Sequence, residues 1–116
     1  MRLEERFLDK YVFYGLKNLN NGFDAPGIRY HSAAEFKIVL ERCEKLGIGL
    51  HGIEPWIEGE FYDVITKEEL GAEANDPTWY YLAFEEFVNR GVELQYSATY
   101  KIPEKLLEDF RKEVEN

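Results

Sequence analysis

The chain has 116 residues, of which 45% are hydrophobic and 32% charged, and its formal net charge is −9. This length is typical of one domain, and the composition predicts a globular chain rather than a disordered one. The acidity argues against general nucleic-acid binding and against docking on anionic membranes, because both require a basic surface. The single cysteine excludes an intrachain disulfide and a cysteine-rich zinc site.

The start of the chain lacks the pattern of a secretory signal, because Glu4 and Glu5 interrupt it early. No run of residues approaches the ~18 apolar positions of a membrane span. We therefore expect a cytoplasmic protein that consists of a single α+β domain over residues 1–116.

The first thirty residues carry the least definite pattern. Residues 3–8 could form a helix, and residues 11–14 could either extend it or form an edge strand. Residues 18–27 are rich in Asn and Gly, which predicts a loop. His31 follows this segment and is expected to be a loop residue.

The first clear helix is predicted to begin after Ser32. Ser32 and Glu35 match a capping box, apolar residues recur at helical spacing over residues 36–46, and Gly47 supplies the stop. Cys43 falls on the apolar stripe of this helix, so we expect a packed and unreactive thiol.

Three segments are predicted to be strands. Residues 48–53 form a short apolar run, and a turn at residues 58–59 leads into a second strand at residues 60–65. Residues 92–100 alternate between apolar and polar, which indicates a strand with one buried face.

Two further helices are predicted in the second half of the chain. Asp76 is suited to the N-cap of the first, Pro77 to its first turn, and Gly91 to its end. The apolar face of this helix is predicted to consist of Tyr80, Ala83, Phe84, Phe87 and Val88. Pro103 opens the last helix. The predicted fold is a small α+β domain with about three helices packed on a mixed or mostly antiparallel sheet of three to four strands.

The negative charge is concentrated in one part of the chain. Residues 54–76 carry a net charge of −7, against +1 for residues 1–53 and −3 for residues 77–116. Aromatic residues lie among these acids, and rings mixed with carboxylates are typical of a surface for a cationic partner. The alternatives are a solubilising acidic loop over an aromatic core, or a metal or catalytic site. The predicted partner-binding residues are Glu54, Trp56, Glu58, Glu60, Tyr62, Asp63, Glu68 and Glu69.

Catalytic chemistry has little support in the sequence. Ser32 is explained as a helix cap, and Ser97 lies on the polar face of a strand, so no activated nucleophile stands out. No spacing is typical of a metal site, and we predict no catalytic residue, no metal and no cofactor. The alternative to a binding protein is a small ligand-binding protein or enzyme with an aromatic-lined pocket around His51 and Glu54.

Part of the sequence resembles a known class of proteins. Gly27-Ile28-Arg29, the helix that follows and the run from Leu46 to Trp56 resemble bacterial polymorphic-toxin immunity proteins of the contact-dependent inhibition type. In one such family a similar helix leads into an apolar strand that ends in two glycines, an acid and an aromatic residue. Here His51 stands in place of the first glycine, and Glu54 and Trp56 follow.

The resemblance implies a protein that binds and blocks a co-encoded toxin domain, and it implies no catalytic residue. We therefore expect a non-enzymatic inhibitor that covers a basic, nuclease-like toxin domain with an acidic and aromatic surface. Its partner would be a cationic protein rather than nucleic acid or a membrane. A third hypothesis is a homodimer formed through an exposed aromatic strand face.

Overall fold

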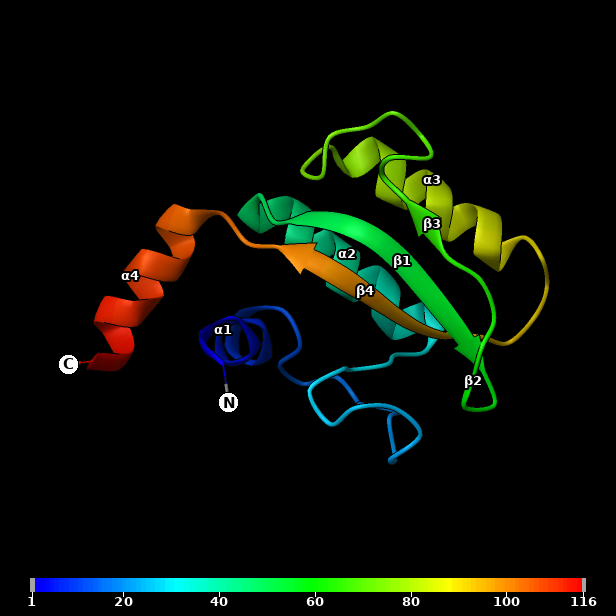
Figure 1. Cartoon of the computed structure of the whole chain (residues 1–116), viewed down its shortest axis with the longest axis horizontal. Coiled ribbons are helices and arrows are strands. Elements are labelled where there is room, and N and C mark those ends of the chain that lie inside the picture. The colour runs from blue at the N-terminus through cyan, green and yellow to red at the C-terminus, as the bar shows by residue number, and fades with distance from the viewer. Residues whose placement is uncertain (1, 116) are drawn as a thin grey trace.

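One long strand, β1 (Gly49–Ile57), organises the sheet in the computed structural model, which describes residues 2–115 (Figure 1). Along one edge, β4 (Gln95–Lys101) pairs with nearly the whole of β1. Two short strands, β2 (Glu60–Phe61) and β3 (Ile65–Thr66), pair with its other edge. Every one of these pairings is antiparallel, which confirms the predicted α+β class.

Helices α2 (Ala33–Leu46) and α3 (Pro77–Val88) pack against one face of this sheet (Figure 1). The predicted start of α2 is confirmed, because Ser32 Oγ accepts the Glu35 backbone N–H at 3.3 Å. Its predicted end is confirmed as well, with Gly47 in the left-handed conformation at φ 73°.

The start of α3 is also where the sequence predicts it. The Asp76 side chain caps the helix by accepting the Thr78 backbone N–H at 3.0 Å, and Pro77 occupies the first turn. The helix ends at Val88, before Gly91, and Val88 is 43% exposed rather than part of the buried face. Trp79 is buried, and so are the other residues of the predicted apolar face: Tyr80, Ala83, Phe84 and Phe87.

Helices α1 (Leu3–Tyr11) and α4 (Glu104–Glu115) pack on each other at the end of the molecule away from β2 (Figure 1). The described chain therefore has four helices, whereas the sequence predicts about three. Helix α1 has only nine residues, too short to be stable alone, and it is held by contacts that lie about a hundred positions away along the chain. Residues 12–14 form no edge strand.

Pro55 interrupts the pairing on the β2 side of the sheet. A proline has no N–H to donate, so it is tolerated in a strand only where the ladder needs no donor. The Pro55 carbonyl accepts the backbone N–H groups of Tyr62 and Asp63 at 3.1 and 3.4 Å. This irregularity leaves residues 62–64 outside the ladder, so the predicted strand at 60–65 is two short strands. The predicted strand at 92–100 begins only at residue 95, because its partner β1 ends at the hairpin.

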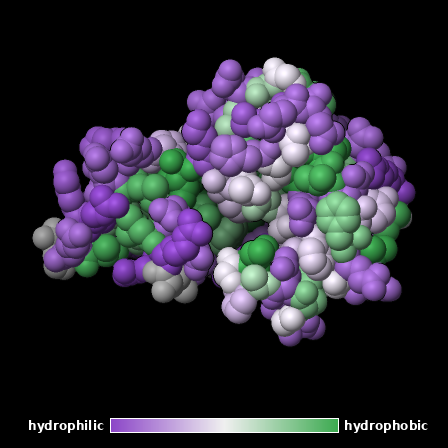
Figure 2. Space-filling model, viewed as in Figure 1, coloured by the Kyte–Doolittle hydropathy of each residue, from purple (hydrophilic) through white to green (hydrophobic). Residues whose placement is uncertain are grey.

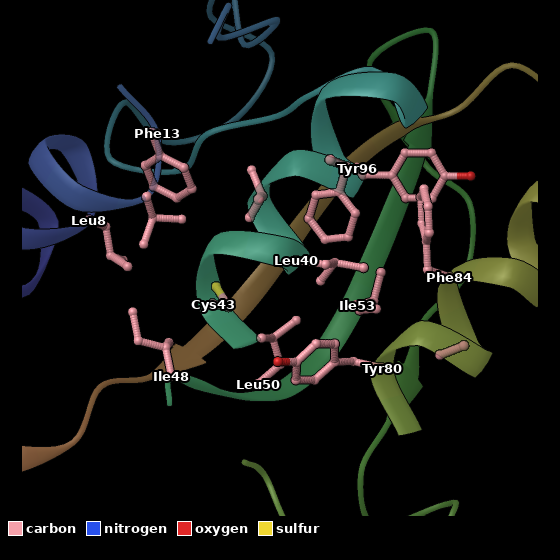
Figure 3. Packing of buried hydrophobic residues seen from close by; sticks show 14 of the residues in the cluster. Leu8, Phe13, Leu40, Cys43, Ile48, Leu50, Ile53, Tyr80, Phe84 and Tyr96 are labelled. Carbon is pink, nitrogen blue, oxygen red and sulfur yellow. The ribbon is translucent and has the colours of Figure 1, made fainter. Parts of the chain in front are cut away.

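A single apolar core joins the sheet to α2 and α3, with Leu40 of α2 beside Ile53 of β1, and with Phe84 of α3 beside Tyr96 of β4 (Figure 3). Cys43 lies in this core as predicted, and burial raises the pKa of its thiol to about 12. The prediction for residues 18–27 is confirmed, since they form no helix or strand.

His31, which the sequence predicts to be a loop residue, is fully buried. Its backbone forms an isolated bridge with Tyr96, which places it at the outer edge of β4. Ser97 lies on the polar face of β4, yet it is buried as well, and its hydroxyl donates to the Glu54 carbonyl at 2.8 Å. Among residues 2–115, no helix has the length and apolar character that crossing a membrane requires.

Candidate interaction surface

The predicted binding residues fall into separate groups along β1, its hairpin and the segment that follows. Strand β2 pairs with residues 56–57 of β1, and β3 pairs with residues 52–53. The hairpin acids next to β2 and the acids that follow β3 are therefore separated by roughly 13 Å along β1. Four groups result: Glu54 with Trp56, Glu58 with Glu60, Tyr62 with Asp63, and Glu68 with Glu69.

Glu54 and Trp56 interact directly. The Trp56 indole N–H donates to the Glu54 carboxylate at 2.8 Å. The Trp56 ring lies 5.7 Å from the Phe23 ring and 5.4 Å from the Tyr30 ring, so the chain's own N-terminal loop packs on it. Trp56 is therefore half-buried, and its polar atom already has a partner within the protein.

Tyr62 and Asp63 are engaged by Arg90, just beyond the C-terminal end of α3. Arg90 Nη1 lies 2.8 Å from the Asp63 carboxylate, and the guanidinium lies 5.7 Å from the centre of the Tyr62 ring. The hydrogen bond from Arg90, aided by one from the Val64 backbone, holds the pKa of Asp63 below its usual value. These two residues join the hairpin to α3 within the protein.

Glu68 and Glu69 belong to the turn after β3, near the opposite end of β1 from the hairpin. Glu69 Oε1 lies 3.3 Å from both the backbone nitrogen and the hydroxyl of Thr66, and Glu68 pairs with Lys67 at 3.2 Å. The backbone N–H of Glu68 and the neighbouring Lys67 lower the pKa of the Glu68 carboxyl. The structure therefore does not bring these two acids together with the hairpin residues.

Glu58 and Glu60 remain exposed on the hairpin that joins β1 to β2. Glu58 has φ 50° and Gly59 has φ 80°, as a tight two-residue hairpin turn requires. Among the described residues, Glu58 is the one non-glycine with a positive φ. The turn is anchored because the Gly59 backbone N–H donates to Gln95 Oε1 at 3.2 Å.

Apolar residues reach the surface beside these two acids. Phe61 is 56% exposed, and it pairs with Trp56, so the two side chains project from the same face of the sheet. Hydrophobic residues come to the surface at this end of the molecule in Figure 2. Val92 and Glu93, from the loop between α3 and β4, share with Glu58 the lining of a hollow of about 350 Å³. We call Glu58, Glu60, Phe61, Val92 and Glu93 the hairpin surface.

Sequence reasoning missed Val92 and Glu93. Their alternating pattern indicates the start of a strand, which says nothing about a hairpin more than thirty positions earlier. Only the pairing of β4 with β1 brings the two segments together. No local signal could have identified them.

At the alternative site, both His51 and Glu54 form hydrogen bonds within the protein. The Glu54 carboxylate accepts the Trp56 indole N–H, and the His51 carbonyl accepts the Lys67 backbone N–H at 3.0 Å. Within residues 2–115, no three His, Cys, Asp or Glu side chains are grouped to hold a metal ion.

Comparisons with known proteins add no relative. No protein-family model matches the chain, and neither the curated proteins nor the solved structures give a significant match.

Proposed function

We propose that this protein is a non-catalytic inhibitor of the immunity type, which covers a cationic, nuclease-like toxin domain in the cytoplasm with its hairpin surface. The observation that carries the proposal is Glu58, a charged residue held in the left-handed conformation at the tip of a tight hairpin. Asn and Gly adopt this conformation with less strain than Glu.

The strain at Glu58 has a physical meaning. A non-glycine residue in the left-handed region costs on the order of 1 kcal/mol, and such strain tends to occur at functional positions. Among residues 2–115, no hydrogen bond or ion pair involves the Glu58 carboxylate, so the side chain does not compensate for the cost locally. Contact with a basic partner would explain why a carboxylate stands here.

Exposed acids and an exposed ring occur on the same hairpin, with Phe61 on the face of Trp56 and Glu60 on the opposite face. Glu58, Glu60 and Glu93 form no ion pair with a basic residue of the described chain. Such acids speed the approach of a basic protein, whereas an exposed ring such as Phe61 slows its dissociation. A surface of this kind acts by covering its partner and needs no catalytic group.

The resemblance to immunity proteins supports the same proposal. The residues that carry the resemblance are Gly27-Ile28-Arg29, helix α2 and the run from Leu46 to Trp56, which forms the end of α2 and most of β1. Glu54 and Trp56 lie toward the end of β1 that leads into the hairpin.

The decisive experiment compares two baits in capture from cells of the source organism. We expect the wild-type chain to retain a basic protein, and the double variant Glu58→Lys, Glu60→Lys to lose it, because reversal replaces attraction with repulsion. Co-expression of the wild-type chain with the captured domain should then restore growth that this domain alone arrests.

The control carries the same change in charge at the other end of the molecule. Glu108 and Glu115 are exposed on α4, and the double variant Glu108→Lys, Glu115→Lys should capture the partner as the wild type does. Equal capture by all three baits, or a captured protein that is harmless when expressed alone, would overturn the proposal.

A further inference from the structure

An apolar groove adjoins the hairpin surface. It encloses about 630 Å³ between the first turn of α2, the loop from α3 to β4 and the beginning of β4. Val92, Glu93 and Gln95 line both this groove and the 350 Å³ hollow at Glu58, so the two lie side by side. We call the larger of the two the β4 groove.

Apolar side chains make up much of the lining of the β4 groove. Val88 and Val92 are 43% and 36% exposed at its side, and Leu94 and Tyr96 are buried beneath it. Ala33 and Ala34 begin α2 with short side chains, which leaves the depression open on that side. An apolar side chain of a partner would bury additional hydrophobic surface here.

The charges around the groove and the hollow all have one sign. One charged residue, Glu93, lines the β4 groove. Two charged residues, Glu58 and Glu93, line the adjoining hollow. No Lys or Arg lines either of them. Neither carboxylate is neutralised by an ion pair within the described chain, so a segment entering the groove meets an uncompensated negative field.

We infer that the β4 groove receives a basic segment of the partner, in which an apolar side chain enters the groove while flanking Lys or Arg residues pair with Glu58 and Glu93. This inference rests on the proposed function, since it names the part of a cationic partner that the hairpin surface recognises. The apolar contact supplies burial, and the flanking charges select a basic segment over an acidic or neutral one.

Three synthetic peptides test the inference by NMR on the ¹⁵N-labelled full chain. One alternates Leu with Lys, the second alternates Leu with Glu, and the third alternates Ser with Lys. We expect the Leu–Lys peptide to shift the amide signals of Val92, Glu93 and Gln95. The Leu–Glu and Ser–Lys peptides should leave these signals in place, because each lacks one of the two required features.

Two variants locate the peptide. Ala34→Phe fills the groove from an exposed position and should abolish the shifts, whereas Ile38→Phe, one turn further along α2 and outside the groove lining, should preserve them. Glu93→Lys should weaken binding by about fivefold, the upper value expected for one exposed ion pair.

The outcomes separate this inference from the proposed function. If the Ser–Lys or Leu–Glu peptide shifts the same signals equally, or Ala34→Phe binds the Leu–Lys peptide unchanged, the groove assignment is wrong. Absence of all shifts also overturns it, while capture through Glu58 and Glu60 would still stand. Conversely, the Leu–Lys peptide could bind in the groove while the chain captures no basic partner from cells. That result would show a peptide-binding site and would refute the proposed inhibitor function.

Discussion

At the scale of single residues, Glu58 links stability to binding. Replacement by Asn should relieve the strain of a left-handed Glu, so Glu58→Asn is expected to raise the free energy of unfolding by about 0.5–1 kcal/mol. The same variant loses a carboxylate of the hairpin surface and should bind the partner more weakly. Urea unfolding measures the first effect and surface plasmon resonance the second. A variant that is less stable than wild type would contradict the turn geometry.

His31 gives the protein an acid-sensitive position. It is fully buried beside Phe13, with ring centroids 5.2 Å apart. Burial, followed by the nearby Arg29, lowers the pKa of His31 from 6.5 to about 4, and Glu35 acts in the opposite direction. Between these two pH values the unfolded chain binds a proton that the folded chain does not bind, so acidification favours unfolding.

The expected result is a loss of stability as the pH falls from about 6.5 to about 4, reaching roughly 3 kcal/mol when complete. Above about pH 6.5 this contribution to pH dependence is absent.

Exposed carboxyl groups also titrate near pH 4, so the test compares the pH slope of urea unfolding between wild type and His31→Phe. The variant should show a shallower slope between about pH 6.5 and about pH 5. Equal slopes would show that His31 is protonated in the folded protein.

At the scale of elements, α4 is held mainly through Phe110. This ring is buried, and its centroid lies 5.6 Å from that of Phe7 and 6.0 Å from that of Tyr11. Ion pairing of Lys10 with Glu113 occurs at the exposed edge of the same contact, where an ion pair adds little. Attachment of α4 to α1 thus depends on aromatic packing.

Phe110→Ala should therefore lower the free energy of unfolding by about 3–5 kcal/mol, the range for deleting a buried Phe side chain. Leu82 is 58% exposed on α3, and Leu82→Ala should change stability by no more than about 0.5 kcal/mol. Urea unfolding of the two variants checks the difference. If both variants unfold at the same urea concentration, α4 is not docked on α1 in solution.

At the scale of the whole molecule, the hairpin surface and α4 lie at opposite ends of a body whose longest dimension is 46 Å (Figure 1). At physiological salt, interactions between exposed charges fade over about 8 Å. Capture of a basic partner therefore depends on the acids near the hairpin more than on the total charge of −9.

We expect the association rate with the captured partner to fall steeply as salt rises from about 0.05 to about 0.5 M, while the dissociation rate changes little. Stopped-flow fluorescence of Trp56 or of a labelled partner would measure both rates. The double variant Glu58→Lys, Glu60→Lys should show a much flatter dependence on salt. An association rate that is insensitive to salt would exclude electrostatic steering.

The sequence by itself determined the local structure of this protein. The Ser32 cap, the Gly47 stop and the Asp76-Pro77 start act within a few residues, so their signals lie next to the elements that they define. The concentration of acids in residues 54–76 was equally visible, because net charge needs no coordinates.

Only the tertiary structure decided which of those acids share a surface. Arg90 pairs with Asp63 within the protein, the turn after β3 separates Glu68 and Glu69 from the hairpin, and strand pairing brings Glu93 beside Glu58. Likewise, α1 is stabilised by α4 from the far end of the chain. These contacts join residues that are distant in sequence, and the short-range patterns that fix caps and turns contain no information about them.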